Sequence, residues 1–290
     1  MNPTNKIILI TGSTDGIGKI TATALAQQGH TVIIHGRNQA KAAQVCQEIK
    51  EAYPHATVDY LIADLLSMTA IRQMVATFQK TYTHLDVLIN NAGAFFDKER
   101  QTTVDGFERT IALNLFAPFL LTQLLLNSLK QSTSARIINL YSAMHRRGGK
   151  PDFNDFQQAH HFKPARAYGL SKLYLVWLTK HWARQFQEQG IANIAVNACH
   201  PGAVATNFGQ DADKGFFTNL IFRTALHFMP KPEVGAQTSI YLATSPEVEG
   251  VTGTFWGYKK NRENPDDRHY SLANENRVWD YCTDTLTPFL

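Results

Sequence analysis

Two kinds of hydrophobic pattern alternate along most of the chain. Short continuous runs rich in β-branched residues, of which residues 6–11 are the first, are typical of strands buried on both faces of a parallel sheet. The longer segments between them space apolar residues about 3.6 apart, as Ile17, Ile20 and Ala24 do before Gly29, and this spacing predicts amphipathic helices. Further strands are predicted at 31–35, 57–62, 87–90, 136–140 and 194–200, and further helices at 39–53, 68–81, 110–126 and 168–189.

This alternation of strands and helices predicts an α/β fold with a doubly wound parallel sheet. No Pro-, Gly- or Ser-rich linker interrupts it, so we expect one domain over residues 1–290. The rhythm stops after Thr206. Residues 209–230 combine a polar loop with an aromatic helical face, which forms either a lid over a substrate site or a packing interface. The segment 257–290 is predicted to be a peripheral helix and tail.

Composition and charge argue against several classes of function. The net charge of +4 is spread along the chain, and its densest basic run, residues 145–150, is too short for a nucleic-acid footprint. Cys46, Cys199 and Cys282 lie far apart, and neither they nor the histidines show ligand spacing, so we expect no metal site. No apolar run approaches a signal-peptide core or a span of about twenty residues, which predicts a cytoplasmic protein without a membrane anchor.

A glycine-rich segment, TGSTDGIG at residues 11–18, directly follows the first strand and opens into a helix. Its glycines therefore lie where a pyrophosphate meets a helix N-terminus. Gly12 allows a sharp turn, Gly16 lets backbone amides approach the phosphates, and Gly18 lets the helix pack closely. A tight glycine turn without a ligand is the alternative. The residues expected to bind a dinucleotide here are Gly12, Ser13, Thr14, Asp15, Gly16, Ile17 and Gly18.

The end of the second strand distinguishes between the two nicotinamide cofactors. NAD-selective sites usually place a carboxylate there to bind the ribose hydroxyls, whereas this chain has HGRN at residues 35–38. Arg37, beside Asn38, has the guanidinium geometry that suits a 2′-phosphate, so we expect NADP(H) in preference to NAD(H). An exposed arginine at a helix start is the alternative. Asp64, followed by Leu65 after the third strand, either bonds the adenine amino group or caps the next helix.

Several short motifs follow one another along the chain: TGSTDGIG, Asp64-Leu65, Asn90-Asn-Ala-Gly93, Asn114, Ser142, Tyr168-Gly-Leu-Ser-Lys172, and Pro201-Gly202 with Thr206. In this order, from Lys6 to about Trp256, the chain resembles the short-chain dehydrogenase/reductase family. The resemblance implies a single-domain Rossmann fold of about seven parallel strands, with a cofactor-binding half at about 5–115 and a catalytic and substrate half at about 116–256. It also implies hydride transfer between NADP(H) and a small-molecule carbonyl or alcohol.

The long segment between Ser142 and Tyr168, together with HPGAVAT at residues 200–206, is similar to the retinol dehydrogenase-like branch of that family. The similarity implies a lipophilic aldehyde, ketone or alcohol as substrate. Tyr141 stands where a second serine is frequent in the family, and it either lines the pocket or points elsewhere. Further side chains that either border the substrate cavity or pack inside the protein are Phe95, Phe96, His145, Phe153 and Phe208.

The predicted catalytic pair is Tyr168 and Lys172. Four residues apart on a helix, they share one face, and an ammonium there favours tyrosinate and lowers a phenol pKa of about 10. Tyr168 then exchanges a proton with the substrate oxygen. Ser142 supplies a second hydrogen bond to that oxygen, or is an ordinary strand-end serine. The resemblance implies that Lys172 also bonds the nicotinamide ribose and that Asn114 holds a water linking the lysine to solvent.

The resemblance implies further cofactor contacts. Asn90, Asn91, Ala92 and Gly93 are expected along the adenosine side. The backbone after Pro201 and Gly202, with Val204 and Thr206, is expected to steady the nicotinamide carboxamide.

Two other functions fit the same motifs. A non-enzymatic NADP(H)-binding sensor or scaffold uses the fold without the chemistry, although the intact set of Asn114, Ser142, Tyr168 and Lys172 argues against it. A nucleotide-sugar epimerase or dehydratase shares the Tyr-Lys pair but normally has a larger substrate domain. Assembly into a homo-oligomer through the helices at 110–126 and 168–189 is implied by the resemblance alone.

Overall fold

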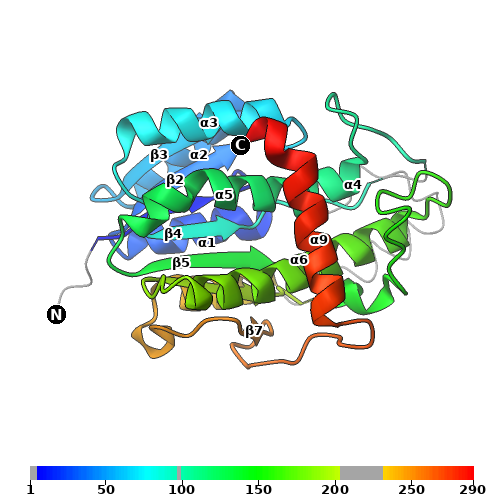
Figure 1. Ribbon diagram of the computed structural model, residues 1–290. Helices are drawn as coiled ribbons and strands as arrows, with labels where there is room; N and C mark the ends of the chain where they lie inside the picture. Colours follow the sequence, from blue (N-terminus) through cyan, green and yellow to red (C-terminus); the bar gives the residue numbers. More distant parts are fainter. Residues whose placement is uncertain (1–4, 97–98, 203–230) are drawn as a thin grey trace.

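The computed structural model describes residues 5–96, 99–202 and 231–290, and these residues form a seven-stranded parallel sheet (Figure 1). The strand order is β3-β2-β1-β4-β5-β6-β7. The strands are β1 (Ile7–Ile10), β2 (Thr31–Gly36), β3 (Thr57–Ile62), β4 (Val87–Asn90), β5 (Ala135–Leu140), β6 (Ile194–Cys199) and β7 (Phe255–Trp256). The predicted α/β fold with about seven parallel strands is confirmed.

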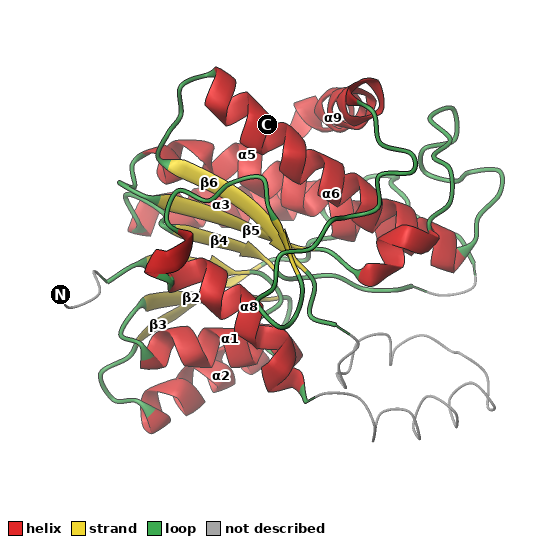
Figure 2. Cartoon of the chain, turned by 90° about the horizontal axis from the view of Figure 1, so that it is seen from below, coloured by secondary structure: helices red, strands yellow, loops and turns green. Residues whose placement is uncertain are grey.

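Helices cover both faces of the sheet (Figure 2). One face carries α1 (Gly16–Gln27), α2 (Gln39–Ala52) and α8 (Pro232–Thr244), and the other carries α3 (Met68–Thr81), α5 (Ala117–Lys130) and α6 (Pro164–Glu188). Successive strand residues serve the two faces in turn, because side chains alternate across a strand. In β1, for example, Ile8 and Ile10 pack with α1 and α2, whereas Leu9 joins the larger core under α5 and α6. This double burial explains the continuous apolar runs.

The sheet order changes direction between β1 and β4, which are neighbours although β2 and β3 lie between them in sequence. Loops that leave the carboxyl ends of such strands diverge and open a crevice, where ligands of this fold class bind. The glycine-rich segment leaves β1 at this edge, Asn91 follows β4, and Ser142 follows β5. The candidate site is therefore assembled from loops at one edge of the sheet.

The predicted helix at 110–126 contains an irregular turn. A short α4 (Arg109–Ile111) passes into a π-helical turn, η1 (Ala112–Phe116), before α5 begins. The spacing of apolar residues did not reveal this turn, because residues 114–122 are all buried and the segment has no polar face on which a change of register could be seen. The segment Arg109–Lys130 is the one described helix long and apolar enough to cross a membrane, and 72% of its most apolar window lies buried inside the protein.

The C-terminal helix packs one face against the rest of the protein. Helix α9 (Leu272–Leu286) crosses α6 (Figure 1), and its buried Val278, Cys282 and Leu286 belong to the larger core. Its spacing of four residues between these positions is that of an amphipathic helix. The helix predicted within residues 257–290 is therefore present, and one of its faces contributes to the core. The remaining short turns are η2 (Ala143–Arg147), η3 (Pro246–Val248) and η4 (Thr287–Phe289).

Candidate active site

The glycine-rich loop has a backbone that few other residues could adopt. Gly12 and Gly16 have φ angles of 63° and 51°, in the left-handed region. A Cβ on Gly18 would lie 2.3 Å from the Gly12 carbonyl oxygen and 2.5 Å from Nδ2 of Asn91. That same Nδ2 donates to the carbonyls of Thr11 at 2.7 Å and Gly12 at 3.1 Å. The backbone of this loop is thus held in place by Asn91 and carries no side chain at Gly12, Gly16 or Gly18. Such a loop fits a dinucleotide, whose pyrophosphate must approach the backbone closely.

A residue that the sequence did not indicate, His35, holds this loop from the neighbouring strand. Its Nδ1 accepts the Gly12 amide at 3.1 Å, and its Nε2 lies 3.2 Å from the Ala63 carbonyl oxygen. Burial lowers the pKa of His35 to about 4, so the ring is neutral and Nε2 carries the proton that Ala63 accepts. The only signal in the sequence was a histidine within an apolar strand, which is equally common in ordinary cores.

The entrance to α1 is occupied by a carboxylate. Asp15 caps the helix through Oδ1, which accepts the Gly16 amide at 2.7 Å, and its Oδ2 pairs with Lys41 Nζ at 2.8 Å. Asn38 caps α2 by accepting the Lys41 amide at 3.0 Å. Arg37 lies between these groups in sequence and is exposed, and its guanidinium makes no hydrogen bond or ion pair with the residues that the structure describes. The predicted Arg37 is thus accessible at the end of β2.

Other predicted cofactor residues turn out to support the loops from inside. Ser13 is buried, and its hydroxyl donates to the Ile10 carbonyl at 2.7 Å. Asn90 donates its side-chain amide to Asn139 at 2.8 Å within the sheet. Asp64 accepts the Leu66 amide at 3.0 Å, whereas the residue that caps α3 is Ser67. The remaining predicted residues lie at the same edge of the sheet: Thr14 in the loop after β1, Ile17 in the first turn of α1, Leu65 after β3, and Ala92 and Gly93 after β4.

The loop after β6 is ordered by a second histidine. His200 Nδ1 accepts the Gly202 amide at 3.1 Å, and its Nε2 bonds Glu263 at 2.9 Å. Gly202 has a φ of 76°, so the turn after Pro201 favours glycine. The predicted Val204 and Thr206 lie outside the described residues, as do Phe208 and the segment 209–230.

The structure brings the predicted catalytic residues together where β5, the π-helical turn and α6 meet. Tyr168 and Lys172 are both buried on α6, and Lys172 Nζ lies 5.9 Å from the centre of the Tyr168 ring. Ser142 and Tyr168 share a side-chain hydrogen bond. Lys172 Nζ donates to the Leu140 carbonyl at 2.9 Å. One hydroxyl pair and one buried amine therefore face each other at the carboxyl edge of the sheet.

Asn114 occupies the π-helical turn and bonds the loop after β4. Its Oδ1 accepts the Ala94 amide at 3.2 Å, and its Nδ2 donates to the carbonyls of Ala94 at 2.9 Å and Thr110 at 3.0 Å. A Cβ on Gly93 would lie 2.8 Å from Asn114 Oδ1 and 3.2 Å from Lys172 Nζ. The side chains of Asn114 and Lys172 thus both approach the backbone of Gly93 closely. The water-holding role implied for Asn114 stays a prediction.

The protonation of the pair differs from the prediction. Burial raises the pKa of Tyr168 to about 12, a rise that the Ser142 hydrogen bond opposes. Burial also lowers the pKa of Lys172 to about 7. The expectation that Lys172 lowers the Tyr168 pKa is wrong for the protein alone, because burial disfavours the charged form of both groups. The site therefore holds a protonated phenol beside an amine that exchanges its proton near neutral pH.

The aromatic residues named from the sequence separate into two groups. Phe95 contacts Tyr168 edge-on, with ring centres 5.7 Å apart, and borders the catalytic pair. Arg109 lies over the Phe96 ring at 4.4 Å. Tyr141 is buried and contacts His145 edge-on at 5.2 Å, so it packs inside the protein.

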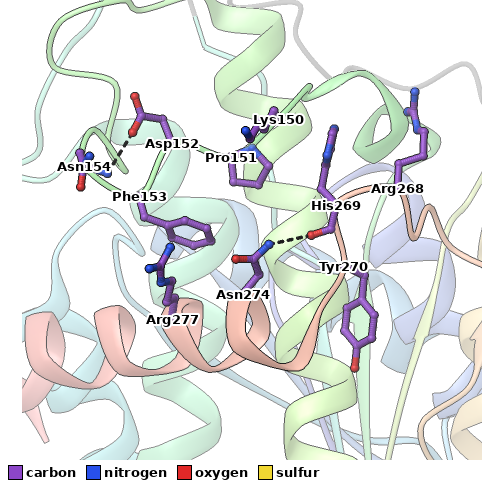
Figure 3. A pocket seen from close by; sticks show the side chains of 10 residues that line it. All are labelled: Lys150, Pro151, Asp152, Phe153, Asn154, Arg268, His269, Tyr270, Asn274 and Arg277. Carbon is purple, nitrogen blue, oxygen red and sulfur yellow. Dashed lines mark hydrogen bonds between the residues drawn. The ribbon is translucent and has the colours of Figure 1, made fainter.

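Phe153 lines a separate cavity of about 430 Å³ between the 150–154 segment and the start of α9 (Figure 3). In that view Arg277 rises from α9 toward Phe153, and its guanidinium lies 5.2 Å from the ring centre. Lys150 and Arg268 also line this space. None of the predicted catalytic or cofactor residues contributes to it. Phe153 is thus a wall of a largely basic cavity to which Tyr168 does not contribute.

Comparison with known proteins identifies the family. The chain matches the short chain dehydrogenase family over residues 6–215. The chain belongs to the short-chain dehydrogenase family. It is 40% identical to human polyprenol dehydrogenase over 257 residues, covering 87% of this chain and 76% of the relative. It is 35% identical to human retinol dehydrogenase 13, covering 94% and 82%.

Among solved structures, this short-chain dehydrogenase is similar to the RhlG/NADP active-site complex of Pseudomonas aeruginosa. The TM-score is 0.68 at 25% identity, and the match covers 88% of this chain and 96% of the other. Family membership and the resemblance to retinol dehydrogenases, expected from the ordered motifs, are thereby confirmed. The chain is accordingly an oxidoreductase of the class that acts on CH–OH groups.

Proposed function

We propose that this short-chain dehydrogenase uses NADP(H) to interconvert a lipophilic alcohol and the corresponding aldehyde or ketone. The observation that carries the proposal is the hydrogen-bonded Ser142–Tyr168 pair with Lys172 Nζ 5.9 Å from the phenol ring, all beside the carboxyl edge of the sheet. This arrangement offers two hydroxyl groups to one substrate oxygen and a nearby amine that can become cationic.

The proposed chemistry assigns one task to each side chain. Bound NADP(H) supplies or accepts the hydride at the substrate carbon. In the reducing direction Tyr168 donates its phenolic proton to the carbonyl oxygen, so that hydride and proton together make the alcohol. Ser142 donates a hydrogen bond to the same oxygen and stabilises the charge that develops on it. Lys172, protonated, stabilises the tyrosinate that remains, and oxidation reverses each step.

The preference for NADP(H) rests on the end of β2. No carboxylate stands there, and the accessible Arg37 guanidinium suits the dianionic 2′-phosphate. Lys41 adds a second positive charge nearby, although Asp15 already pairs with it. The similar Pseudomonas aeruginosa structure, which is an NADP complex, supports the same preference.

The lipophilic substrate is supported by the aromatic wall and by the relatives. Phe95 contacts Tyr168 edge-on and is itself half-buried, so an apolar surface adjoins the reacting hydroxyl. The similar proteins are named for polyprenol and for retinol, both long apolar alcohols. Cytoplasmic location and self-association through α5 and α6 stay predictions, and light scattering on the purified protein measures the second.

The deciding experiment follows NADPH and, separately, NADH absorbance with retinal, aliphatic and aromatic aldehydes, steroid ketones and quinones. Wild-type protein is compared with Tyr168→Phe, which keeps the ring and removes the hydroxyl. We expect turnover of an apolar carbonyl with NADPH, and a loss of at least about a hundredfold in kcat without Tyr168. Tight NADPH binding without turnover on any of these carbonyls contradicts the proposal.

A further inference from the structure

The turn that carries Ser142 is bonded to the C-terminal segment through one buried histidine. His145, which is 2% exposed, lies in η2 directly after β5. Its Nδ1 lies 2.7 Å from the Ser142 carbonyl oxygen, and its Nε2 lies 2.9 Å from the Asp266 amide. An amide can only donate, so Nε2 is the acceptor and Nδ1 carries the proton that Ser142 accepts.

Both the carbonyl oxygen and the hydroxyl oxygen of Ser142 accept hydrogen bonds from this short turn. Its carbonyl oxygen accepts a second hydrogen bond, from the His145 backbone amide, at 2.9 Å. Its hydroxyl oxygen accepts the Met144 amide at 3.2 Å. Both donors to the Ser142 carbonyl therefore belong to His145, and the orientation of the peptide that bears the Ser142 side chain depends on that residue.

The C-terminal segment and the same turn each donate a hydrogen bond to the other. Arg146 donates to the Asn264 carbonyl at 2.9 Å, and Arg268 donates back to the Arg146 carbonyl at 2.5 Å. Asp266 in turn bonds the Arg268 guanidinium at 2.6 Å. Residues 264–268 thus form a strap across η2, and the bond from Asp266 to His145 is its buried member.

The other side of the turn rests on the catalytic helix. A Cβ on Gly169, the residue after Tyr168, would lie 2.7 Å from the Gly148 Cα. The backbones of the turn and of α6 are therefore in direct contact, so a shift of the turn changes the distance between Ser142 and Tyr168.

We infer that His145 is a positioning residue that fixes Ser142 against Tyr168 and anchors the strap 264–268 to the active site. This inference rests on the proposed role of Ser142. Burial lowers the pKa of His145, the hydrogen bond to the Ser142 carbonyl opposes this, and Arg146 and His200 act with burial whereas Asp266 acts against it. The ring is therefore neutral, as an acceptor at Nε2 requires.

Two substitutions by amide side chains test the two side-chain hydrogen bonds of His145 one at a time. In His145→Asn the amide nitrogen stands near the position of Nδ1 and can still donate to Ser142, but nothing reaches Asp266. In His145→Gln the amide oxygen stands near Nε2 and can accept from Asp266, but the side-chain donor to Ser142 is lost and only the backbone amide of residue 145 still donates to it. His181 supplies the matched control, because it is likewise a buried histidine. It lies on α6, outside the proposed site, and its Nδ1 bonds Glu275 at 3.1 Å.

The measurement is kcat with NADPH and the best carbonyl, together with Tm and NADPH affinity, for these variants and Ser142→Ala. We expect His145→Gln to lose about tenfold to a hundredfold in kcat with unchanged NADPH affinity, because misplacement of a reacting group is costly. We expect His145→Asn to keep kcat within about threefold and to lower Tm, because a buried amide loses its acceptor. His181→Gln lowers Tm alone.

The outcomes separate this inference from the proposed function. Wild-type kcat in His145→Gln, with Ser142→Ala inactive, overturns the positioning role and leaves the proposed function standing. Equal losses in His145→Asn and His145→Gln, each explained by the fall in Tm, also overturn it. Full activity in Ser142→Ala removes the basis of both. If His145→Gln does not fold, a hundredfold loss of kcat in a folded His145→Asn contradicts the inference by itself.

Discussion

Gly93 approaches Lys172 so closely that a Cβ on it would lie 3.2 Å from Lys172 Nζ, and 2.8 Å from Asn114 Oδ1. The first of these distances joins the loop after β4 to α6, and the second joins it to the π-helical turn. The absence of one side chain thus allows the proposed catalytic amine and its neighbouring amide to share a small buried space.

The substitution Gly93→Ala is expected to reduce kcat by about tenfold or more, because the new methyl group displaces Lys172 and Asn114 from Tyr168. Gly190→Ala is the control. Gly190 has a φ of 69° with nothing within 4 Å of a built Cβ, so it carries the backbone cost of about 1 kcal/mol in the free energy of unfolding without a contact near the site. Unchanged kcat in Gly93→Ala means that Lys172 has room to move.

The substitution Lys172→Met is expected to abolish turnover and yet to stabilise the protein at neutral pH. Burial lowers the pKa of Lys172 to about 7, whereas the unfolded lysine has a pKa of about 10.4. At pH 7 folding must therefore either bury a charged amine or remove its proton, and both reduce stability. Methionine removes this penalty but leaves the Leu140 carbonyl without its donor. The net gain at pH 7 is about 1–3 kcal/mol in the free energy of unfolding.

The sign of its pH dependence checks that explanation. The native state binds fewer protons at Lys172 than the unfolded state between pH 7 and the unfolded pKa, so wild-type stability rises with pH across this window. The advantage of Lys172→Met must therefore shrink from pH 7 toward pH 10 in urea denaturation. An advantage that stays constant over that range shows that the amine is not desolvated.

The substitution Arg37→Ala is expected to raise the KM for NADPH by about tenfold to a hundredfold and to leave the KM for NADH nearly unchanged, because only the 2′-phosphate differs. Lys41→Ala is the matched control, since it removes a charge from the same loop edge but one already paired with Asp15. A similar loss for both cofactors assigns Arg37 to general loop structure and removes the argument for NADP(H).

The fold was predictable from the sequence because parallel strands buried on both faces leave continuous apolar runs, as at Ile8, Leu9 and Ile10. The short motifs likewise located Ser142, Tyr168 and Lys172. What pattern alone did not show were contacts between distant segments, such as His35 beneath Gly12 and Asp266 against His145. Neither hydrophobic periodicity nor a local motif records a hydrogen bond across 121 residues of chain.

The pKa directions at Tyr168 and Lys172 were missed for a related reason. A spacing of four residues places an amine and a phenol on one helix face, but the balance between their attraction and desolvation depends on how deeply they lie. Both are nearly inaccessible, at 6% and 4% exposed, and burial prevails for each. The burial of both side chains results from the packing of η1, β5 and α6 around them. The hydrophobic pattern of one helix does not specify that packing.

The substitution Glu275→Gln tests the attachment of α9 to α6. Glu275 is fully buried and bonds His181 at 3.1 Å, the Tyr270 hydroxyl at 2.8 Å, and the Arg184 guanidinium. These bonds lower its pKa against the effect of burial. Because the folded pKa lies below the unfolded one, the contribution is complete above the unfolded pKa and is lost as pH falls through the folded value.

At pH 7, Glu275→Gln should therefore lower the free energy of unfolding by about 2–4 kcal/mol, since Arg184 and His181 lose a buried partner. The loss should diminish as the pH falls through the lowered pKa of Glu275, where the wild-type carboxylate takes up a proton. Urea denaturation of both proteins at pH 7 and at a pH of about 3 measures this. The pair of Lys19 with Glu48 is the control, because solvent screens an exposed ion pair, and Glu48→Gln should change stability little at either pH. A difference for Glu275→Gln that is equally large at both pH values would show that the carboxylate acts through packing rather than charge.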